Sequence, residues 1–186
     1  TIRSILKAFF DWLVEEKIIY DNPMVKIRPY RVSETYIEAL TSDELDLIRS
    51  ACNSLRERAL IEVLCSTGCS LSEVAKLEID KINWETNEIV ICGGNKRNRI
   101  VFISPNAIKH LKDYLETRDD DCKEVFISQK KPYRMLSNRT IQREISKIIR
   151  RTSIKKAVSP KTFRHTFAKM MLDNGCPMNV LQTLLG

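Results

Sequence analysis

Two basic side chains near the start of an apolar segment are the clearest candidates for chemistry in this sequence. Lys161 and Arg164 lie three residues apart, just after Ser159-Pro160. A serine followed by a proline is typical of a helix start, because the hydroxyl can cap the first amides and proline fits the first helical position. Residues three apart share one face of a helix, so both cations would lie beside the exposed helix-start amides. This arrangement predicts a binding site for a phosphate or a similar anion.

Positive charge is concentrated around this segment. The whole chain has a formal net charge of +7, whereas residues 130–169 carry thirteen Lys or Arg against one acid, Glu144, a balance of +12. A solvated surface of mixed charge is the ordinary alternative. The near absence of compensating acids instead favours a polyanion partner, most simply nucleic acid. The cations that we expect to contact DNA are Arg97, Arg99, Lys130, Lys131, Arg134, Arg139, Arg143 and Lys147.

Two further segments combine turn residues with polar groups. Thr67-Gly68-Cys69-Ser70-Leu71-Ser72-Glu73 has the pattern of a helix stop and restart, which is its structural alternative. Gly93-Gly94-Asn95-Lys96-Arg97-Asn98 joins two strand-like runs, 88–92 and 99–103, and so predicts a β-hairpin. Lys96 would lie at the hairpin tip, where the alternative is a basic turn that only stays solvated.

Taken in order, these motifs resemble those of the tyrosine recombinases, the family of phage and transposon integrases. Residues 161–168 resemble the motif His/Lys-x-x-Arg-His-Thr-Phe-Ala, and residues 184–186 resemble its Leu-Leu-Gly. Residues 67–77 resemble Thr-Gly-x-Arg-[apolar]-Ser-Glu-x-x-x-Leu, with Ser70 at the arginine position. The hairpin resembles Gly-Lys-Gly-x-Lys-x-Arg, in which the usual lysine position falls on Gly94 and Lys96 is the nearest ammonium.

The resemblance implies a site-specific DNA recombinase, which cleaves a strand through a 3′-phosphotyrosyl bond and rejoins it to a partner strand. Because the covalent link keeps the phosphodiester energy, neither a metal nor another cofactor is needed. Carried over to this chain, Arg164 clamps the phosphate, Lys161 assists the phosphate or the leaving group, and Lys96 is the general acid. Ser70 brings no charge to the place of the first arginine. His165 is a catalytic candidate whose alternative is a structural histidine.

The nucleophilic tyrosine of the family has no counterpart among the tyrosines present. All five precede Ser159 in the chain, whereas the family's nucleophile follows the Leu-Leu-Gly motif. We therefore expect that this position lies past Gly186, and that the chain as given binds DNA without cleaving it.

The periodicity of apolar residues predicts a mainly helical α+β fold with one small antiparallel sheet. Val125–Ser128 is expected to add a short third strand to the hairpin. Together with the resemblance, the pattern implies residues 1–28 as the last helix of a core-binding, DNA-clamping domain, 29–40 as a linker, and 41–186 as a catalytic domain without its C-terminal end. The expected helices cover 2–19, 56–66, 70–77, 104–116, 138–151 and 159–174, with a short one opening at the capping box of residues 41–44.

The composition limits the remaining possibilities. A chain of 186 residues that is 43% hydrophobic and 30% charged fits one soluble domain plus a smaller piece. No apolar run reaches membrane-spanning length and no signal peptide is evident. Six cysteines without a Cys-x-x-Cys pair, and only two histidines, give no reason to expect a metal site and indicate reduced thiols.

The expected partner is double-stranded DNA, with no membrane. The full-length protein is expected to form a homo-tetramer on DNA, and this fragment to be monomeric or weakly associating. The expected location is the cytoplasm, for a bacterial or phage-encoded protein associated with the nucleoid. Three alternatives stay open at this point: a catalytically dead DNA-binding regulator, a type IB topoisomerase, and a plain helical DNA-binding module.

Overall fold

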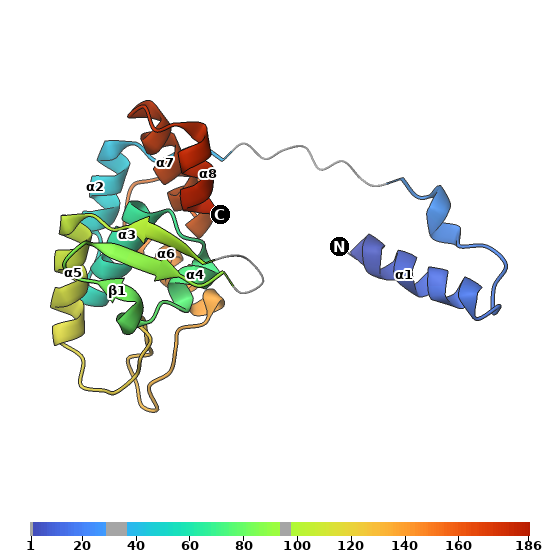
Figure 1. The fold of residues 1–186 in the computed structure, drawn as a ribbon, viewed down its shortest axis with the longest axis horizontal. Coiled ribbons are helices and arrows are strands. Elements are labelled where there is room, and N and C mark those ends of the chain that lie inside the picture. Colours follow the sequence, from blue (N-terminus) through green and yellow to red (C-terminus); the bar gives the residue numbers. More distant parts are fainter. Residues whose placement is uncertain (1, 29–36, 94–97) are drawn as a thin grey trace. The chain divides into compact units, whose positions relative to one another are not determined.

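The structure, a computed structural model, describes residues 2–28, 37–93 and 98–186. The chain divides into two compact units, Thr1–Tyr36 and Ile37–Gly186, which are drawn in Figure 1. The division falls inside the segment 29–40, which the sequence predicts to be a linker. Most of that segment, residues 29–36, lies outside the described residues.

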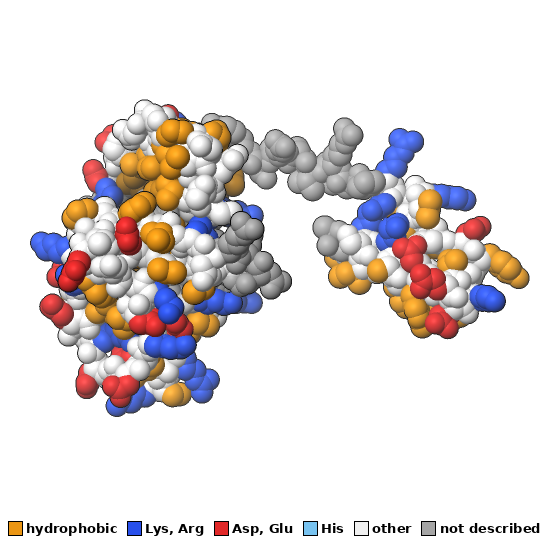
Figure 2. All heavy atoms as spheres, in the orientation of Figure 1, with side chains coloured by type: hydrophobic (Ala, Val, Ile, Leu, Met, Phe, Trp, Pro, Cys, Tyr) orange, Lys and Arg blue, Asp and Glu red, His pale blue; other side chains and the backbone are white. Residues whose placement is uncertain are grey.

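The first unit is an amphipathic helix, α1 (Ile2–Glu15), followed by a short 3₁₀ helix, η1 (Pro23–Lys26). The side chain of Arg3 on α1 donates two hydrogen bonds to the carbonyl of Ile27, at 3.1 and 2.7 Å. None of the fourteen residues of α1 is buried. Several of its large apolar side chains are exposed instead, namely Ile2, Ile5, Leu6, Phe9 and Trp12. Figure 2 shows hydrophobic side chains on the surface of this unit. An exposed apolar face of this kind is typical of a helix that packs on another surface.

The expected end of this helix, at residue 19, was wrong. The helix ends at Glu15, and Lys17 adopts a left-handed conformation with φ of 58°. The amide of Ile18 donates to the carbonyl of Leu13 and the amide of Lys17 to that of Val14, both at 3.0 Å. These two bonds form a Schellman motif, which satisfies carbonyls at a helix end. Glycine is the usual residue at the left-handed position, so a lysine there gives no stop signal in the sequence.

The second unit carries helices around a small sheet, as the sequence predicts. Its helix α2 (Ser42–Ser50) opens with the expected capping box, in which Thr41 accepts from the Glu44 amide at 3.2 Å and Glu44 accepts from the Thr41 amide at 2.8 Å. The other elements, in chain order, are α3 (Leu55–Thr67), α4 (Leu71–Ala75), the 3₁₀ helix η2 (Ile79–Lys81), β1 (Ile82–Asn83), β2 (Glu88–Ile91), β3 (Arg99–Phe102), α5 (Pro105–Glu116), α6 (Asn138–Ile149), α7 (Pro160–Asp173) and α8 (Met178–Leu185).

Helix α3 is the centre of this unit and packs against both α5 and α7. Leu60, Ile61 and Leu64 are completely buried, and even the charged Glu62 is only 2% exposed. Buried residues therefore lie around most of the circumference of this helix rather than along one stripe. Figure 1 shows α3 behind the sheet, with the other helices arranged around it. A helix enclosed in this way gives the helices around it a fixed support, including α7, which carries the two predicted cations.

The sheet is antiparallel, with strand order β1-β2-β3, and it confirms the predicted hairpin. Ile89 lies opposite Val101, and both side chains are buried. Val90 lies opposite Ile100, and both are exposed. Because alternate residues of a strand face opposite sides, one face of the sheet covers the core and the other faces outward. Residues 94–97, between β2 and β3, lie outside the described residues.

The prediction that Val125–Ser128 forms the third strand was wrong. The third strand is Ile82–Asn83, which pairs with β2. Within 125–128 the only bridge is an isolated one between Ile127 and Met135. Val125 and Phe126 are fully buried, so the apolar run is explained by its place in the core. A short buried run has the same composition in either case, and periodicity does not distinguish the two.

The start of the second unit is attached to α7 and to the loop before it. The amide of Leu40 donates to the hydroxyl of Thr166 at 2.9 Å, and this hydroxyl donates to the carbonyl of Thr162 at 2.8 Å. Lys156 donates to the carbonyl of Ala39 at 2.7 Å and pairs with Glu44 at 2.7 Å. The chain therefore enters this unit through contacts with the helix that carries Arg164.

Candidate anion-binding site

The second unit contains a pocket of about 690 Å³. It is lined by the N-terminal ends of α4, α6 and α7, which are distant from one another in the sequence. Helix α7 contributes Lys161 and Arg164, and Ser70 lies at the start of α4. The sequence analysis expected Ser70, Lys161 and Arg164 in one site, and α6 adds Asn138 and Gln142 to the walls of this pocket. The complete set of described lining residues is Ser70, Leu71, Ser72, Asn138, Gln142, Ser159, Pro160, Lys161 and Arg164.

The local fold of α7 separates its core residues from its pocket residues. Ser159 is the N-cap, with Pro160 at the first position, as predicted, and the amide of Ser159 donates to the hydroxyl of Thr162 at 3.0 Å. Thr162, Phe163 and Thr166 are buried, whereas Lys161 is exposed. The helical period of 3.6 residues therefore turns the two cations toward the pocket while the opposite face joins the core.

Arg164 is held by carbonyls from two other parts of the chain. Its Nη1 donates to the carbonyl of Gly68 at 3.2 Å and its Nη2 to that of Leu185, in the last turn of α8, at 2.7 Å. The side chain is 28% exposed. A guanidinium has five donor hydrogens in a planar fork, so these two bonds orient the group and leave donors for an anion.

Gly68 must be a glycine for this contact to form. It ends α3 with a φ of +60°, and a Cβ built there would lie 2.3 Å from the Phe167 ring. Both the left-handed backbone and the close approach exclude a larger residue without rearrangement. The Thr-Gly pair of the motif is therefore a helix end that brings a carbonyl to Arg164.

Glu73 connects several parts of the site. Its carboxylate accepts two hydrogen bonds from Arg99, at 2.6 and 3.0 Å, and one from the amide of Ser70 at 2.7 Å. Burial would raise the pKa of Glu73, but the hydrogen bonds from Arg99 and Ser70 outweigh it and lower the pKa to about 2. Sequence reasoning assigned no role to Glu73, although the Ser-x-x-Glu spacing of a capping box was a signal for it.

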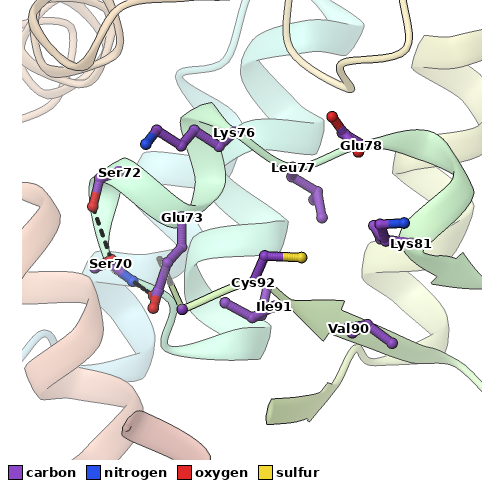
Figure 3. Close-up of a pocket in the computed structure, with 11 residues that line it drawn as sticks. Ser70, Ser72, Glu73, Lys76, Leu77, Glu78, Lys81, Val90, Ile91 and Cys92 are labelled. Atoms are coloured by element: carbon purple, nitrogen blue, oxygen red, sulfur yellow. Dashed lines mark hydrogen bonds between the residues drawn. The ribbon is translucent and has the colours of Figure 1, made fainter. Parts of the chain in front are cut away.

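Ser70 stands at the junction of the anion pocket and a second pocket of about 450 Å³. Figure 3 shows the second pocket, with the first turn of α4 at one end and Val90, Ile91 and Cys92 of the β2 region along another side. The hydroxyl of Ser70 lies 3.3 Å from that of Ser72. At the position of the family's first arginine, the chain therefore presents a small neutral hydroxyl.

The other described residues that were predicted for the site do not line the anion pocket. Arg99 has a side chain that is only 8% exposed and is bonded to Glu73 and to the carbonyl of Leu184, at 2.8 Å. His165 is exposed and is not among the residues that line the anion pocket. Lys96 and Arg97 lie outside the described residues. The predicted DNA-contacting cations that are exposed are Lys130, Lys131, Arg134, Arg139, Arg143 and Lys147.

The one acid of the basic stretch does not neutralise this surface. Glu144 on α6 is directed inward and pairs with Arg56 of α3, whose side chain is 10% exposed. Burial raises the pKa of Glu144 despite the nearby Arg56 charge. The outward face of α6 carries Arg139, Arg143 and Lys147 instead.

Within the described ranges 2–28, 37–93 and 98–186, no cluster of three or more His, Cys, Asp or Glu side chains could hold a metal ion. None of the described helices combines the length and apolarity that crossing a membrane requires.

Comparison with known proteins relates the chain to one family. The family model described as "Phage integrase family" matches residues 38–186. The tyrosine recombinase XerD of Lacticaseibacillus casei is 30% identical over 194 residues, which cover 98% of this chain and 66% of that protein. The tyrosine recombinase XerC of Chlamydia muridarum is 30% identical over 193 residues, covering 98% of this chain and 61% of that protein. The chain thus spans slightly less than two thirds of the length of these relatives.

Solved structures agree with this result. The crystal structure of XerA recombinase aligns with a TM-score of 0.74 at 28% identity, covering 97% of this chain and 64% of that one. A lambda integrase dimer bound to a COC′ core site aligns with a TM-score of 0.80 at 18% identity, covering all of this chain and 70% of that one, which shows a shared fold. The alternatives of a topoisomerase and a catalytically dead regulator are not favoured by relatives of this kind. The match of the family model over residues 38–186 shows that the chain belongs to the phage integrase family, the tyrosine recombinases.

Proposed function

We propose that this protein binds duplex DNA and takes part in site-specific strand cleavage and rejoining, with the phosphate to be attacked held in the anion pocket. The observation that carries the proposal is the meeting of Arg164, Lys161 and the start of α7 in one pocket. The described residues lining this pocket include two cations and no carboxylate. A site of this composition favours a multiply charged oxyanion over a neutral ligand.

Helix dipoles add to the charge of the two side chains. The first residue of α6, Asn138, and the first residue of α7, Pro160, both line the pocket. The N-terminus of a helix carries a partial positive charge and amides without a partner within the helix. The two helices have twelve and fourteen residues, so both are long enough for this effect. The pocket is therefore positive from its backbone as well as from Arg164 and Lys161.

These groups suit phosphoryl transfer to a tyrosine hydroxyl. Attack on the phosphate places additional negative charge on its non-bridging oxygens, and a planar guanidinium such as that of Arg164 can donate to two of them. Lys161 would add a mobile charge at the edge of the pocket, and Lys96 would donate a proton to the leaving 5′ oxygen. We keep His165 as a further candidate because it follows Arg164 directly. Titrations of a His165→Gln variant with duplex DNA would test whether His165 contributes to binding.

DNA outside the pocket would contact the exposed face of α6 and the loop before it. Arg139, Arg143 and Lys147 follow helical spacing along that face, as expected for contacts with successive phosphates. Several structures that share this fold are DNA complexes, among them XerH site-specific recombinase bound to difH substrate. We propose the same class of partner for this chain, with assembly into a tetramer on DNA and a cytoplasmic, nucleoid-associated location in a bacterium.

The proposal is tested with duplex DNA and two charge-removing variants. Affinity is measured by fluorescence anisotropy at several salt concentrations for the unmodified chain, Arg164→Met and Lys161→Met. The logarithm of the affinity should fall with the logarithm of the salt concentration with a slope of about 0.9 for each phosphate neutralised. Each variant loses about one phosphate contact and should therefore reduce the magnitude of the slope by about 0.9. Lys109→Met on α5 is the control, since Lys109 is an exposed cation that does not line the pocket. Unchanged affinity and slope in both pocket variants would refute the proposal.

A further inference from the structure

Arg99 and Arg164 compete for a single carboxylate. Glu73 Oε2 accepts from Arg99 Nη2 at 3.0 Å, while the same oxygen lies 3.9 Å from Arg164 Nη1. The second oxygen, Oε1, accepts from Arg99 Nη1 at 2.6 Å. Both carboxylate oxygens are thus engaged by Arg99, and Arg164 is left at the limit of an ion pair.

The burial of Arg99 and Glu73 strengthens their ion pair and so affects which arginine Glu73 binds. The side chains of Arg99 and Glu73 are 8% and 17% exposed, so water does not readily screen their charges. Arg164 is more exposed and lines the anion pocket, whereas neither Arg99 nor Glu73 is among the described lining residues of that pocket. A carboxylate released from Arg99 would find Arg164 as the nearest cation in the described part of the site.

We propose that Arg99 is a positioning residue, which holds Glu73 away from Arg164 and so keeps the Arg164 guanidinium available to a phosphate in the anion pocket. The sequence interpretation had placed Arg99 among the DNA-contacting cations. In this proposal it binds no DNA, and its charge acts through Glu73 on the residue that does. The proposal rests on the proposed function, because it assumes that Arg164 contacts the phosphate.

The backbone around Arg99 supports a fixed position for its side chain. Its Nε donates to the carbonyl of Leu184 at 2.8 Å, and the next carbonyl, that of Leu185, accepts from Arg164 at 2.7 Å. The last turn of α8 therefore holds both guanidinium groups side by side. The helix C-terminus carries a partial negative charge, which favours two cations there. Glu73 is hydrogen-bonded to one of these groups, that of Arg99, and its nearer oxygen stays 3.9 Å from Nη1 of Arg164.

The test is a rescue experiment on the intact chain. Arg99→Met removes the charge while keeping most of the length of the side chain. Binding of inorganic phosphate, followed by NMR shifts, should weaken by roughly tenfold, because Glu73 then forms a charge-assisted contact with Arg164 that phosphate must displace. Adding Glu73→Gln to this variant should restore the affinity to within about twofold of the unmodified chain, since an amide has no charge to neutralise Arg164.

A matched control separates this effect from general loss of stability. Arg118 has a side chain that is also 8% exposed, and it pairs with Asp120. Neither residue lines the anion pocket. Arg118→Met should therefore lower the unfolding temperature while leaving phosphate affinity unchanged. Salt titrations with duplex DNA give a second readout, because Arg99→Met should lower the salt slope by no more than the one contact of Arg164, and adding Glu73→Gln should restore it.

Each outcome decides the proposal. Unaltered phosphate affinity in folded Arg99→Met, or a double variant as weak as the single one, would overturn it. A reduced salt slope that Glu73→Gln does not restore would also overturn it, because Arg99 itself would then contact DNA. If Arg99→Met does not unfold cooperatively, Arg99→Lys replaces it, with an expected weakening of roughly threefold that Glu73→Gln again removes. Failure of the proposed function is distinguishable, because then Arg164→Met would itself leave DNA affinity unchanged.

Discussion

Replacing Ser70 with arginine tests the geometry of the anion pocket most directly. Ser70 lines the pocket together with Arg164 and Lys161, and it is the N-cap residue of α4. The bond from its amide to Glu73 uses the backbone and so does not depend on the side chain. The substitution therefore adds a guanidinium to the wall of the pocket while keeping the hydrogen bond by which Glu73 caps the first turn of α4.

The variant should bind phosphate more tightly and be less stable. A charge-assisted, bidentate contact contributes about 1.5–3 kcal/mol, which corresponds to roughly 10- to 150-fold in affinity. Loss of the serine at an N-cap costs about 0.5–2 kcal/mol of stability. Repulsion from Arg164 and Lys161 in the unliganded protein adds to that cost, and bound phosphate would relieve it. Affinity and stability should thus change in opposite directions.

Phosphate affinity by NMR and unfolding by urea measure the two effects on the same samples. Ser72→Arg is the matched control, since Ser72 lines the same pocket, is exposed, and gains the same charge. With duplex DNA, Ser70→Arg should also steepen the salt dependence by about 0.9. Equal gains from Ser70→Arg and Ser72→Arg would refute the reasoning, because a nonspecific increase in positive charge would then explain both.

Three other predictions follow from the described contacts. The pKa values of Glu73 and Asp120 are both lowered to about 2, so their ion pairs stabilise the fold fully above pH 4.5 and progressively less as the pH falls toward 2. Acid unfolding followed by circular dichroism should show this loss of stability, and the loss should be smaller in Glu73→Gln. Gly68→Ala should destabilise the protein by about 2–4 kcal/mol in urea unfolding, since it combines a positive φ with a clash against Phe167. A loss of unfolding free energy no larger than that of an exposed surface substitution would contradict this geometry. A chain that begins at residue 37 should unfold as cooperatively as the whole chain and should associate less in sedimentation experiments, because it lacks the exposed apolar face of α1. Loss of cooperative unfolding would instead show that α1 stabilises the second unit.

The parts of the fold that sequence could predict are those encoded by local signals. The start of α7 was recognised because Ser159-Pro160 is a strong local pattern, and the spacing of Lys161 and Arg164 placed both on one face. The end of α1 was missed because Lys17 occupies a position where glycine is usual. Helix α8 was not predicted, and its N-cap position is Pro177, which offers no side-chain acceptor.

The parts of the site that could not be predicted depend on long-range contacts. Arg99 was assigned to DNA because it lies in a basic hairpin, yet its partner Glu73 is 26 residues away and both are largely buried. A charge count along the chain treats every arginine as exposed. Likewise, the carbonyls of Gly68 and Leu185 that hold Arg164 are backbone groups, which carry no sequence signature.

The attachment of Leu40 to Thr166 makes the entry of the second unit a mechanical coupling. Thr166 lies two residues after Arg164 on α7, and its hydroxyl is bonded on one side to Leu40 and on the other to Thr162. A pull on the chain before Ile37 would act on α7 through these two bonds, as well as on α2 through the chain itself. The same pull would load Lys156, which is bonded to Ala39. Tension on the upstream chain would therefore act on the helix that carries Arg164.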